Sequence, residues 1–211
     1  MKILVTGNQG YIGTVLTSEL LNENFQVIGF DVGYFKNCLL TPFKENFLQI
    51  NKDIREINKE DLKEVEAIVH LSGLSNDPLG EFDKKITREI NFDATIRLAK
   101  LSKDIGIKRF VYASSQSMYG ISDTTAELDE YNSDKKPLTE YAKTKWDAEV
   151  ELNKLNSNNF TVVSFRPSTV FGASPRLRCD IVYNYFLACA YTTGKIEIKS
   201  DGSPFRPVIH V

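Results

Sequence analysis

Two side chains with complementary acid–base chemistry, Tyr141 and Lys145, stand four residues apart in the second half of the chain. In a helix this spacing places them on one face. A tyrosine hydroxyl titrates near ~10 and is a poor base at neutral pH, but a neighbouring ammonium group favours the phenolate. The pair could therefore take a proton from a substrate hydroxyl. Ser115, at the end of an apolar run, could hydrogen-bond the same oxygen.

A glycine-rich turn follows the apolar run at residues 3–5 and precedes a helical apolar pattern. Because glycine lacks a Cβ, Gly7 could form the tight turn, Gly10 could admit a diphosphate to the backbone, and Gly13 could pack helix against strand. Phosphates bind at helix N-termini because free N–H groups and the helix dipole favour negative charge. The turn predicts a dinucleotide site. An ordinary strand–helix turn is the alternative, because the spacing differs from Gly-x-Gly-x-x-Gly.

Asp31 indicates the type of dinucleotide, because it ends the next apolar run, at residues 27–30. An acid about 20 residues beyond the glycine turn hydrogen-bonds the ribose of NAD, and its charge repels the extra phosphate of NADP. Asp31 therefore predicts NAD, with a surface aspartate as the alternative. Asp53 and Ile54 follow a third strand at residues 47–50 and could contact adenine, although an aspartate there is more often a turn residue.

Apolar runs alternate with helical patterns, which predicts an α/β fold with a parallel sheet and helices on both faces. The run at residues 67–71 is nearly continuous and indicates a strand buried on both faces. Ligands bind beyond the carboxyl ends of such strands, so Leu71, Ser72 and Gly73 are expected in the cofactor groove. His70 lies inside the run and is interpreted as a hydrogen-bonded core histidine rather than a catalytic one.

The remaining pattern predicts helices at residues 59–65, 82–105, 139–155 and 179–193, strands at residues 110–113, 160–165, 196–198 and 208–211, and a loop at residues 168–178. Thr139 is expected to cap the N-terminus of the helix at residues 139–155, and Gly106 is expected to end the helix at residues 82–105. Asn91 falls inside a predicted helix. Asparagine is a poor helix former, so it is expected on the surface.

The composition is that of an ordinary globular protein, with 211 residues, 42% hydrophobic residues and a net charge of −2. No block of Lys and Arg indicates nucleic-acid binding, and no apolar run approaches the ~20 residues of a membrane-spanning helix. Cys38, Cys179 and Cys189 lack the spacing of a disulfide framework or a zinc site. A reduced, cytoplasmic setting without a bound metal is therefore expected.

Together these motifs closely resemble the extended short-chain dehydrogenase/reductase family, in particular its NAD-dependent nucleotide-sugar epimerases and dehydratases. The residues that carry the resemblance are Thr6-Gly7-x-x-Gly10-x-x-Gly13, Asp31, Asp53-Ile54, His70-Leu71-Ser72-Gly73, Asn91, Ser114-Ser115, Met118-Tyr119-Gly120, Tyr141-x-x-x-Lys145 and Arg166-Pro167. They span the chain in the family's order. The resemblance implies a Rossmann-type doubly wound parallel sheet that binds NAD, followed by a substrate-binding lobe.

The resemblance also implies roles for individual residues. Ser115, Tyr141 and Lys145 match the catalytic residues, and Asn91 matches a structural asparagine that supports the lysine, often through water. The cofactor-binding residues would be Gly7, Gly10, Tyr11, Ile12, Gly13, Asp31, Asp53, Ile54, Leu71, Ser72, Gly73, Ser114, Tyr141 and Lys145. The substrate-binding residues would be Ser115, Thr169, Arg176, Arg178 and Arg206, of which Arg206 matches an arginine that holds the nucleotide diphosphate.

The implied function is that of an NAD-dependent nucleotide-sugar epimerase acting at C4, with transient hydride transfer to NAD and Tyr141 as base. Two alternatives stay open: an NAD(P)H-dependent reductase or dehydrogenase of a keto-sugar nucleotide or other carbonyl compound, and a non-catalytic NAD-binding fragment. Dehydration is disfavoured because Gln116-Ser117 stands where the 4,6-dehydratases carry Asp-Glu. Thr169 replaces an asparagine that touches substrate in many epimerases, which leaves the sugar open.

Residues 1–170 are expected to form the NAD-binding domain. Residues 171–211 would begin a substrate-binding lobe, truncated because the sequence stops within a predicted strand. Such a fragment could bind NAD without turning over substrate. A nucleotide sugar is the expected partner, and relatives suggest a homodimer through the helices at residues 82–105 and 139–155.

Overall fold

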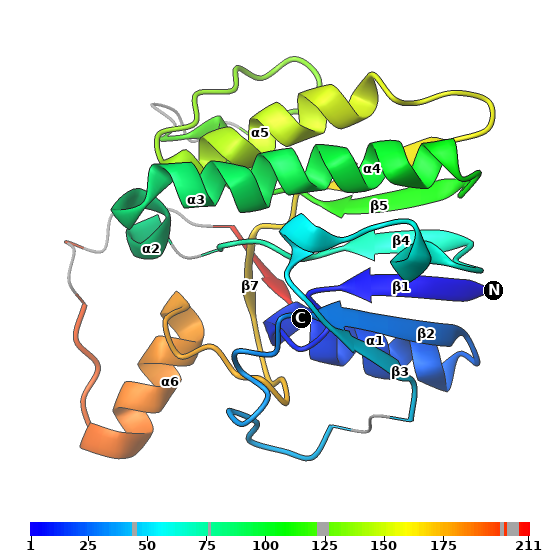
Figure 1. The fold of residues 1–211 in the computed structure, drawn as a ribbon. Helices are drawn as coiled ribbons and strands as arrows, with labels where there is room; N and C mark the ends of the chain where they lie inside the picture. The colour runs from blue at the N-terminus through cyan, green and yellow to red at the C-terminus, as the bar shows by residue number, and fades with distance from the viewer. Residues whose placement is uncertain (44–45, 76, 122–126, 199–200, 202–206) are drawn as a thin grey trace.

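The computed structural model describes residues 1–43, 46–75, 77–121, 127–198, 201 and 207–211, and its centre is a six-stranded parallel sheet (Figure 1). The strands are β1 (Lys2–Thr6), β2 (Gln26–Asp31), β3 (Leu48–Asn51), β4 (Ala67–His70), β5 (Arg109–Ala113) and β6 (Thr161–Phe165). Their order in the sheet is β3-β2-β1-β4-β5-β6. This order confirms the predicted doubly wound sheet. The sequence order of the strands changes direction between β1 and β4, and ligands bind at this point in folds of this kind.

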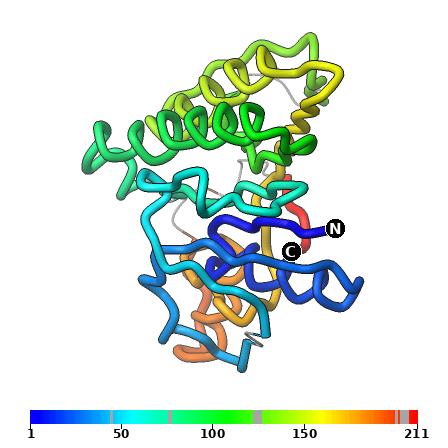
Figure 2. Tube along the Cα trace, turned by 45° about the vertical axis from the view of Figure 1, so that its right-hand side comes forward, coloured from blue at the N-terminus to red at the C-terminus, as the bar shows by residue number. Residues whose placement is uncertain are grey.

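Alternating side chains of β1 divide the interior into two layers. Leu4 is buried in the larger core together with α4 (Ala94–Asp104) and α5 (Glu140–Asn153). Val5, its neighbour, faces the opposite side and packs in the smaller core under α1 (Tyr11–Asn22). The helices α4 and α5 run side by side over one face, as Figure 2 shows from a second direction.

The single helix predicted at residues 82–105 is divided in the structure, so its predicted continuity was wrong. Asp83 separates α2 (Asp77–Phe82) from α3 (Lys84–Arg88), because its side chain caps α3 by accepting a hydrogen bond from an amide of the first turn at 2.9 Å. A π-helical turn, η3 (Glu89–Asp93), then precedes α4. Such turns insert one residue into a helix and are frequent at functional sites.

Two predicted helix ends are confirmed. The hydroxyl of Thr139 caps α5, and Gly106 ends α4 in the left-handed region with a φ of 85°. The helix predicted at residues 59–65 is only the 3₁₀ turn η2 (Glu60–Leu62). Glu64 adopts a φ of 60°, which interrupts any right-handed helix at that point.

The predicted loop at residues 168–178 contains a strand, β7 (Thr169–Phe171). It pairs in parallel with β8 (Val208–His210) in a separate two-stranded sheet. The strand predicted at residues 196–198 is absent, since residues 195–198 have no regular structure. An alternating pattern of three residues forms a strand only where another strand pairs with it.

The last helix, α6 (Val182–Thr193), lies beyond the carboxyl ends of the sheet strands, on the same side of the molecule as α2 (Figure 1). It begins three residues later than the predicted helix at residues 179–193. The division of the chain at residue 170 stays a prediction. No helix in the described part of the chain is long and apolar enough to cross a bilayer.

Candidate active site

The glycine turn brings the ends of β1, β4 and α1 into close contact. Gly7 has a φ of +73°, and a Cβ on it would lie 2.8 Å from the amide nitrogen of Ser72. A Cβ on Gly13 would lie 2.1 Å from the carbonyl oxygen of Gly7, whereas at Gly10 the nearest atom would be 3.2 Å away. Two of the glycines are therefore required by packing, and Gly10 leaves room at the helix N-terminus.

The groups around this turn fit a dinucleotide. Gly10 is the N-cap of α1 and supplies no side-chain hydrogen bond, so amides of the first turn are available to an anion. The carboxylate of Asp31 lies against the turn, where it accepts hydrogen bonds from the amides of Gln9 at 3.2 Å and Gly33 at 2.8 Å. The buried Gln9 Oε1 has no hydrogen-bond partner among the described residues. Free amides, a carboxylate and an unsatisfied carbonyl suit a diphosphate with its ribose.

Other predicted cofactor residues have structural partners of their own. The hydroxyl of Tyr11 donates to the carbonyl of Gly172 at 2.8 Å, so its side chain links α1 to the residue that follows β7. Asp53 caps a 3₁₀ turn and binds the guanidinium of Arg55 at 2.8 Å, which lowers the pKa of the carboxyl group. Ile54 is buried in the larger core. These contacts show a turn aspartate and a core isoleucine, and the adenine role stays a prediction.

Lys145 is 4% exposed, and its ammonium donates to the carbonyl of Ala113 at 2.7 Å. The ammonium nitrogen lies 4.8 Å from the ring centre of Tyr112 and 5.9 Å from that of Tyr141. Burial lowers the pKa of Lys145 to about 8. The structure therefore brings together the predicted Tyr–Lys pair at the carboxyl end of β5, with the cation largely removed from water.

Ser115 lies just beyond β5, as the N-cap of the 3₁₀ turn η4 (Gln116–Tyr119). Its hydroxyl is 2.8 Å from the hydroxyl of Ser117 and accepts from the Ser117 amide at 3.2 Å. The turn η4 packs against α5, the helix that carries Tyr141. The neighbouring Ser114 hydroxyl is buried without a partner among the described residues. Ser115 is thus held at the same end of the sheet as the Tyr–Lys pair.

Asn91 is 1% exposed, so the expectation of a surface position was wrong. The π turn directs its side chain inward, where the amide oxygen accepts from the Leu74 amide at 2.8 Å and the amide nitrogen donates to the Leu74 carbonyl at 3.0 Å. The amide nitrogen also lies 3.4 Å from the hydroxyl of Thr144, the residue before Lys145. Asn91 therefore links the loop after β4 to α5.

His70 is a fully buried and hydrogen-bonded core residue, as predicted. Its ring nitrogens lie 2.7 Å from the hydroxyl of Thr6 and 2.8 Å from that of Thr95. Burial, with a smaller contribution from the charge of Lys145, lowers the pKa of His70 to about 3. The ring is neutral at physiological pH.

Sequence reasoning missed an ion pair beside the site. Glu149 is 3% exposed and binds the guanidinium of Arg166 through both carboxylate oxygens, at 2.5–3.2 Å. The same guanidinium donates to the hydroxyl of Tyr119 at 2.6 Å. Glu149 follows Tyr141 and Lys145 at the same four-residue spacing, and this spacing was the signal that could have revealed it.

The predicted substrate residues are only partly brought together. Arg178 binds Asp180 at 2.6 Å and the hydroxyl of Ser75 at 3.0 Å, which places it beside the loop after β4. Arg176 stacks on the ring of Phe35 at 4.1 Å, and Thr169 lies in β7. Arg206 lies outside the described residues.

A glycine turn at the switch point of the sheet, with an adjoining carboxylate and a Tyr–Lys pair whose lysine is buried, is the arrangement of a dinucleotide-binding α/β protein. Residues 3–211 match the profile of the NAD dependent epimerase/dehydratase family, and the chain belongs to this family. NAD is the cofactor of this family. The nucleotide-binding fold of the family is the one observed here.

Individual relatives give the same picture. The whole chain is 25% identical to a probable UDP-glucuronate 4-epimerase of Rhizobium meliloti (strain 1021), of which it spans 65%. It is 29% identical to MoeE5, solved in complex with UDP-glucose and NAD, with a TM-score of 0.84 over 100% of this chain and 68% of that one. TunA, an NAD dependent-NDP-hexosamine 5,6-dehydratase, has a TM-score of 0.87 at 23% identity, over 99% of this chain and 67% of that one, which shows the fold alone. The chain spans about two thirds of the length of these relatives.

Replacing Lys145 by methionine should change the pH dependence of stability. Between the lowered pKa of about 8 in the folded chain and the ordinary value of 10.5, the unfolded chain binds more protons than the folded one. The free energy of unfolding of the wild type should therefore rise relative to Lys145→Met by about 1.4 kcal/mol per pH unit above pH 8. Urea unfolding across this range measures the difference. A constant difference would contradict the burial argument, and Lys63→Met, at an exposed lysine, is the matched control.

Replacing Arg166 by methionine should leave the carboxylate of Glu149 buried without its cation and cost about 3–5 kcal/mol of unfolding free energy. The double variant Arg166→Met/Glu149→Met should recover most of this loss, because no buried charge remains. Denaturant unfolding of the single and double variants tests this, with Lys154→Met in the exposed Lys154–Glu151 pair as control. Equal stability of the single and double variants would show that the unpaired carboxylate of Glu149 does not destabilise the fold.

Proposed function

We propose that this chain is the NAD-binding part of a nucleotide-sugar epimerase that acts at C4 of the sugar. The observation that carries the proposal is the buried ammonium of Lys145 beside the ring of Tyr141, at the carboxyl end of β5. The position of Asp31 against the glycine turn supports NAD rather than NADP. The UDP-sugar relatives support a nucleotide sugar as substrate.

In this proposal bound NAD supplies the site that accepts hydride from the sugar carbon and returns it to the opposite face. Tyr141, as phenolate, takes the proton of the C4 hydroxyl and later returns it to the same oxygen. The positive charge of Lys145 stabilises that phenolate, and the charge acts strongly because few water molecules can surround it. Ser115 hydrogen-bonds the C4 oxygen and keeps it aligned with Tyr141.

The residue types at the start of η4 disfavour dehydration as the reaction. Eliminating water needs a group that can protonate the departing hydroxyl. Gln116 and Ser117, the residues after Ser115, carry no carboxyl group. The hydroxyl of Ser117 is also engaged with Ser115 at 2.8 Å. Besides the hydride transfer with NAD, an epimerase needs only proton exchange at one oxygen, which Tyr141 can perform.

Asp31→Ala should weaken NAD binding by about tenfold and remove the preference for NAD over NADP, because the carboxylate both holds the ribose and repels the additional phosphate. Calorimetric titration of wild type and variant with both dinucleotides measures this. Glu60→Ala, at an exposed glutamate outside the site, is the control and should bind like the wild type. A wild-type chain that is folded yet binds neither dinucleotide would refute the cofactor assignment.

Tyr141→Phe should lower turnover of a UDP-sugar by about 10²–10⁴-fold while leaving NAD affinity nearly unchanged, because it removes one proton-transfer group and little binding surface. Sugar products are followed by chromatography, and NADH by absorbance. An epimerase converts many sugars per NAD, whereas consumption of one NADH per product would indicate a reductase. Measurable turnover that is equal in wild type and variant would exclude Tyr141 as the base.

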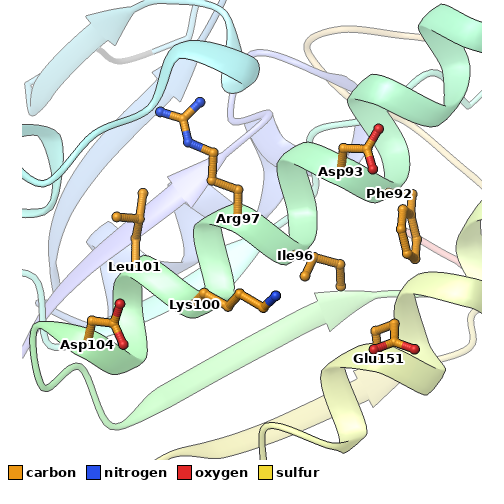
Figure 3. A pocket seen from close by; sticks show the side chains of 8 residues that line it. All are labelled: Phe92, Asp93, Ile96, Arg97, Lys100, Leu101, Asp104 and Glu151. Atoms are coloured by element: carbon orange, nitrogen blue, oxygen red, sulfur yellow. The ribbon is translucent and has the colours of Figure 1, made fainter.

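A homodimer through α4 and α5 is part of the same proposal. A groove of about 530 Å³ runs along these helices (Figure 3). Its lining combines apolar and oppositely charged side chains, namely Phe92, Asp93, Ile96, Arg97, Lys100, Leu101, Asp104 and Glu151. Mixed charges around an apolar centre allow a surface to pair with a second copy of itself.

Light scattering should give twice the mass of one chain for the wild type and the mass of one chain for Ile96→Glu, which places a charge in the apolar centre of the groove. Circular dichroism confirms that the variant is folded, and Lys63→Glu outside the groove is the control. A wild type that has the mass of one chain at high concentration would contradict the dimer.

A further inference from the structure

A chain of hydrogen bonds crosses the buried layer between β4 and α4. The amide of Ser72 lies 3.3 Å from the hydroxyl of Thr6, which lies 2.7 Å from Nδ1 of His70. Nε2 of His70 lies 2.8 Å from the hydroxyl of Thr95, which donates to the backbone carbonyl of Asn91 at 2.8 Å. The three side chains in this chain of bonds, those of Thr6, His70 and Thr95, are fully buried, so no water competes for these bonds.

The series of hydrogen bonds ends at Asn91, whose side chain leads back to the loop that contains Ser72. The side chain of Asn91 binds both the amide and the carbonyl of Leu74, two residues after Ser72. Gly73, which lies between the two anchored residues, is close to the active site, since a Cβ added to it would lie 3.7 Å from the ammonium of Lys145. The loop 72–74 is therefore fixed at both ends by one set of bonds and packs against the lysine.

The donors and acceptors determine the direction of the bonds. The Thr95 hydroxyl has one proton, which it gives to the Asn91 carbonyl, so it must accept from Nε2–H of His70. A neutral ring then has an unprotonated Nδ1, which accepts from the Thr6 hydroxyl. Thr6 in turn accepts from the Ser72 amide. Only one tautomer of His70 satisfies every group.

We propose that His70 is a positioning residue for Lys145: as the neutral Nε2–H tautomer, it ties the loop 72–74 to the π turn that carries Asn91, and so keeps Lys145 covered. Without this tie the loop would move away from the ammonium and admit water. The inference rests on the proposed function in so far as Lys145 is the catalytic lysine. The lowered pKa of His70 agrees with a ring that stays neutral. Two titratable groups act on the ring: Lys145 through its charge, and Tyr112, whose ring stacks on it with the centroids 6.0 Å apart.

Nitrogen NMR of the wild-type chain tests the tautomer without requiring NAD or substrate. His70 should show a protonated Nε2 and an unprotonated Nδ1, with no titration between about pH 5 and 8. The chain has two histidines, so a His210→Gln variant assigns the signals. The opposite tautomer, or a normal titration, would overturn the proposal.

Thr95→Val breaks the tie at nearly constant side-chain volume. The pKa of Lys145, followed by carbon NMR of its ε-methylene, should rise from about 8 by about half a unit or more as water reaches the ammonium. The Leu74 amide should exchange about tenfold faster. Thr17→Val is the matched control, because Thr17 is also fully buried but its hydroxyl has no partner among the described residues. Equal effects of the two variants would overturn the proposal.

These outcomes are independent of the proposed function. A chain that shows the expected tautomer and the Thr95→Val effect but binds no NAD would keep the positioning role and refute the cofactor assignment. A protein that binds NAD but has the opposite tautomer of His70 would keep the cofactor assignment and refute the positioning role.

Discussion

The burial of one ammonium group, that of Lys145, is the constraint around which the site is built. Its hydration is replaced by one carbonyl, that of Ala113, and by the faces of the Tyr112 and Tyr141 rings. This replacement is incomplete, as the lowered pKa of the lysine shows. The same loss of water strengthens the field of the cation at Tyr141. The interaction that weakens the fold at neutral pH is thus the one that would make the tyrosine a base.

Keeping that cation covered requires backbone segments to approach more closely than side chains allow. A Cβ on Gly73 would lie 3.0 Å from the amide oxygen of Asn91 and 3.7 Å from the Lys145 ammonium. Gly7 brings the end of β1 against Ser72 in the same way. The glycines of the two loops therefore serve one purpose, which is to close the space between the nucleotide turn and the catalytic helix.

The features that the sequence predicts well are local ones. The parallel sheet with helices on both faces follows from apolar runs that alternate with helical patterns, and the Tyr141–Lys145 pair follows from a four-residue spacing. The features that it does not predict depend on distant contacts. Asn91 is buried only because a π turn rotates it toward Leu74, seventeen positions away in the chain. Strand β7 exists because β8, far along the chain, pairs with it.

The register of the sheet shows how stability and chemistry are separated along the strands. One row across four strands is apolar, with Leu4 beside Ile68, Ile68 beside Phe110 and Phe110 beside Val162. All four side chains are buried and belong to the larger core. This row gives the sheet an apolar centre that any parallel sheet of this kind requires.

Two positions nearer the carboxyl ends, the row on the same face becomes polar: Thr6 beside His70, His70 beside Tyr112, and Tyr112 beside Ser164. Thr6 and His70 are hydrogen-bonded, whereas the hydroxyls of Tyr112 and Ser164 have no partner among the described residues. Unsatisfied buried hydroxyls cost stability, about 1–3 kcal/mol each. These unsatisfied hydroxyls lie at the end of the sheet that is next to Lys145 and the glycine turn. A polar layer there fixes orientations that apolar packing alone would leave free, and this links the stability of the fold to the geometry of its site.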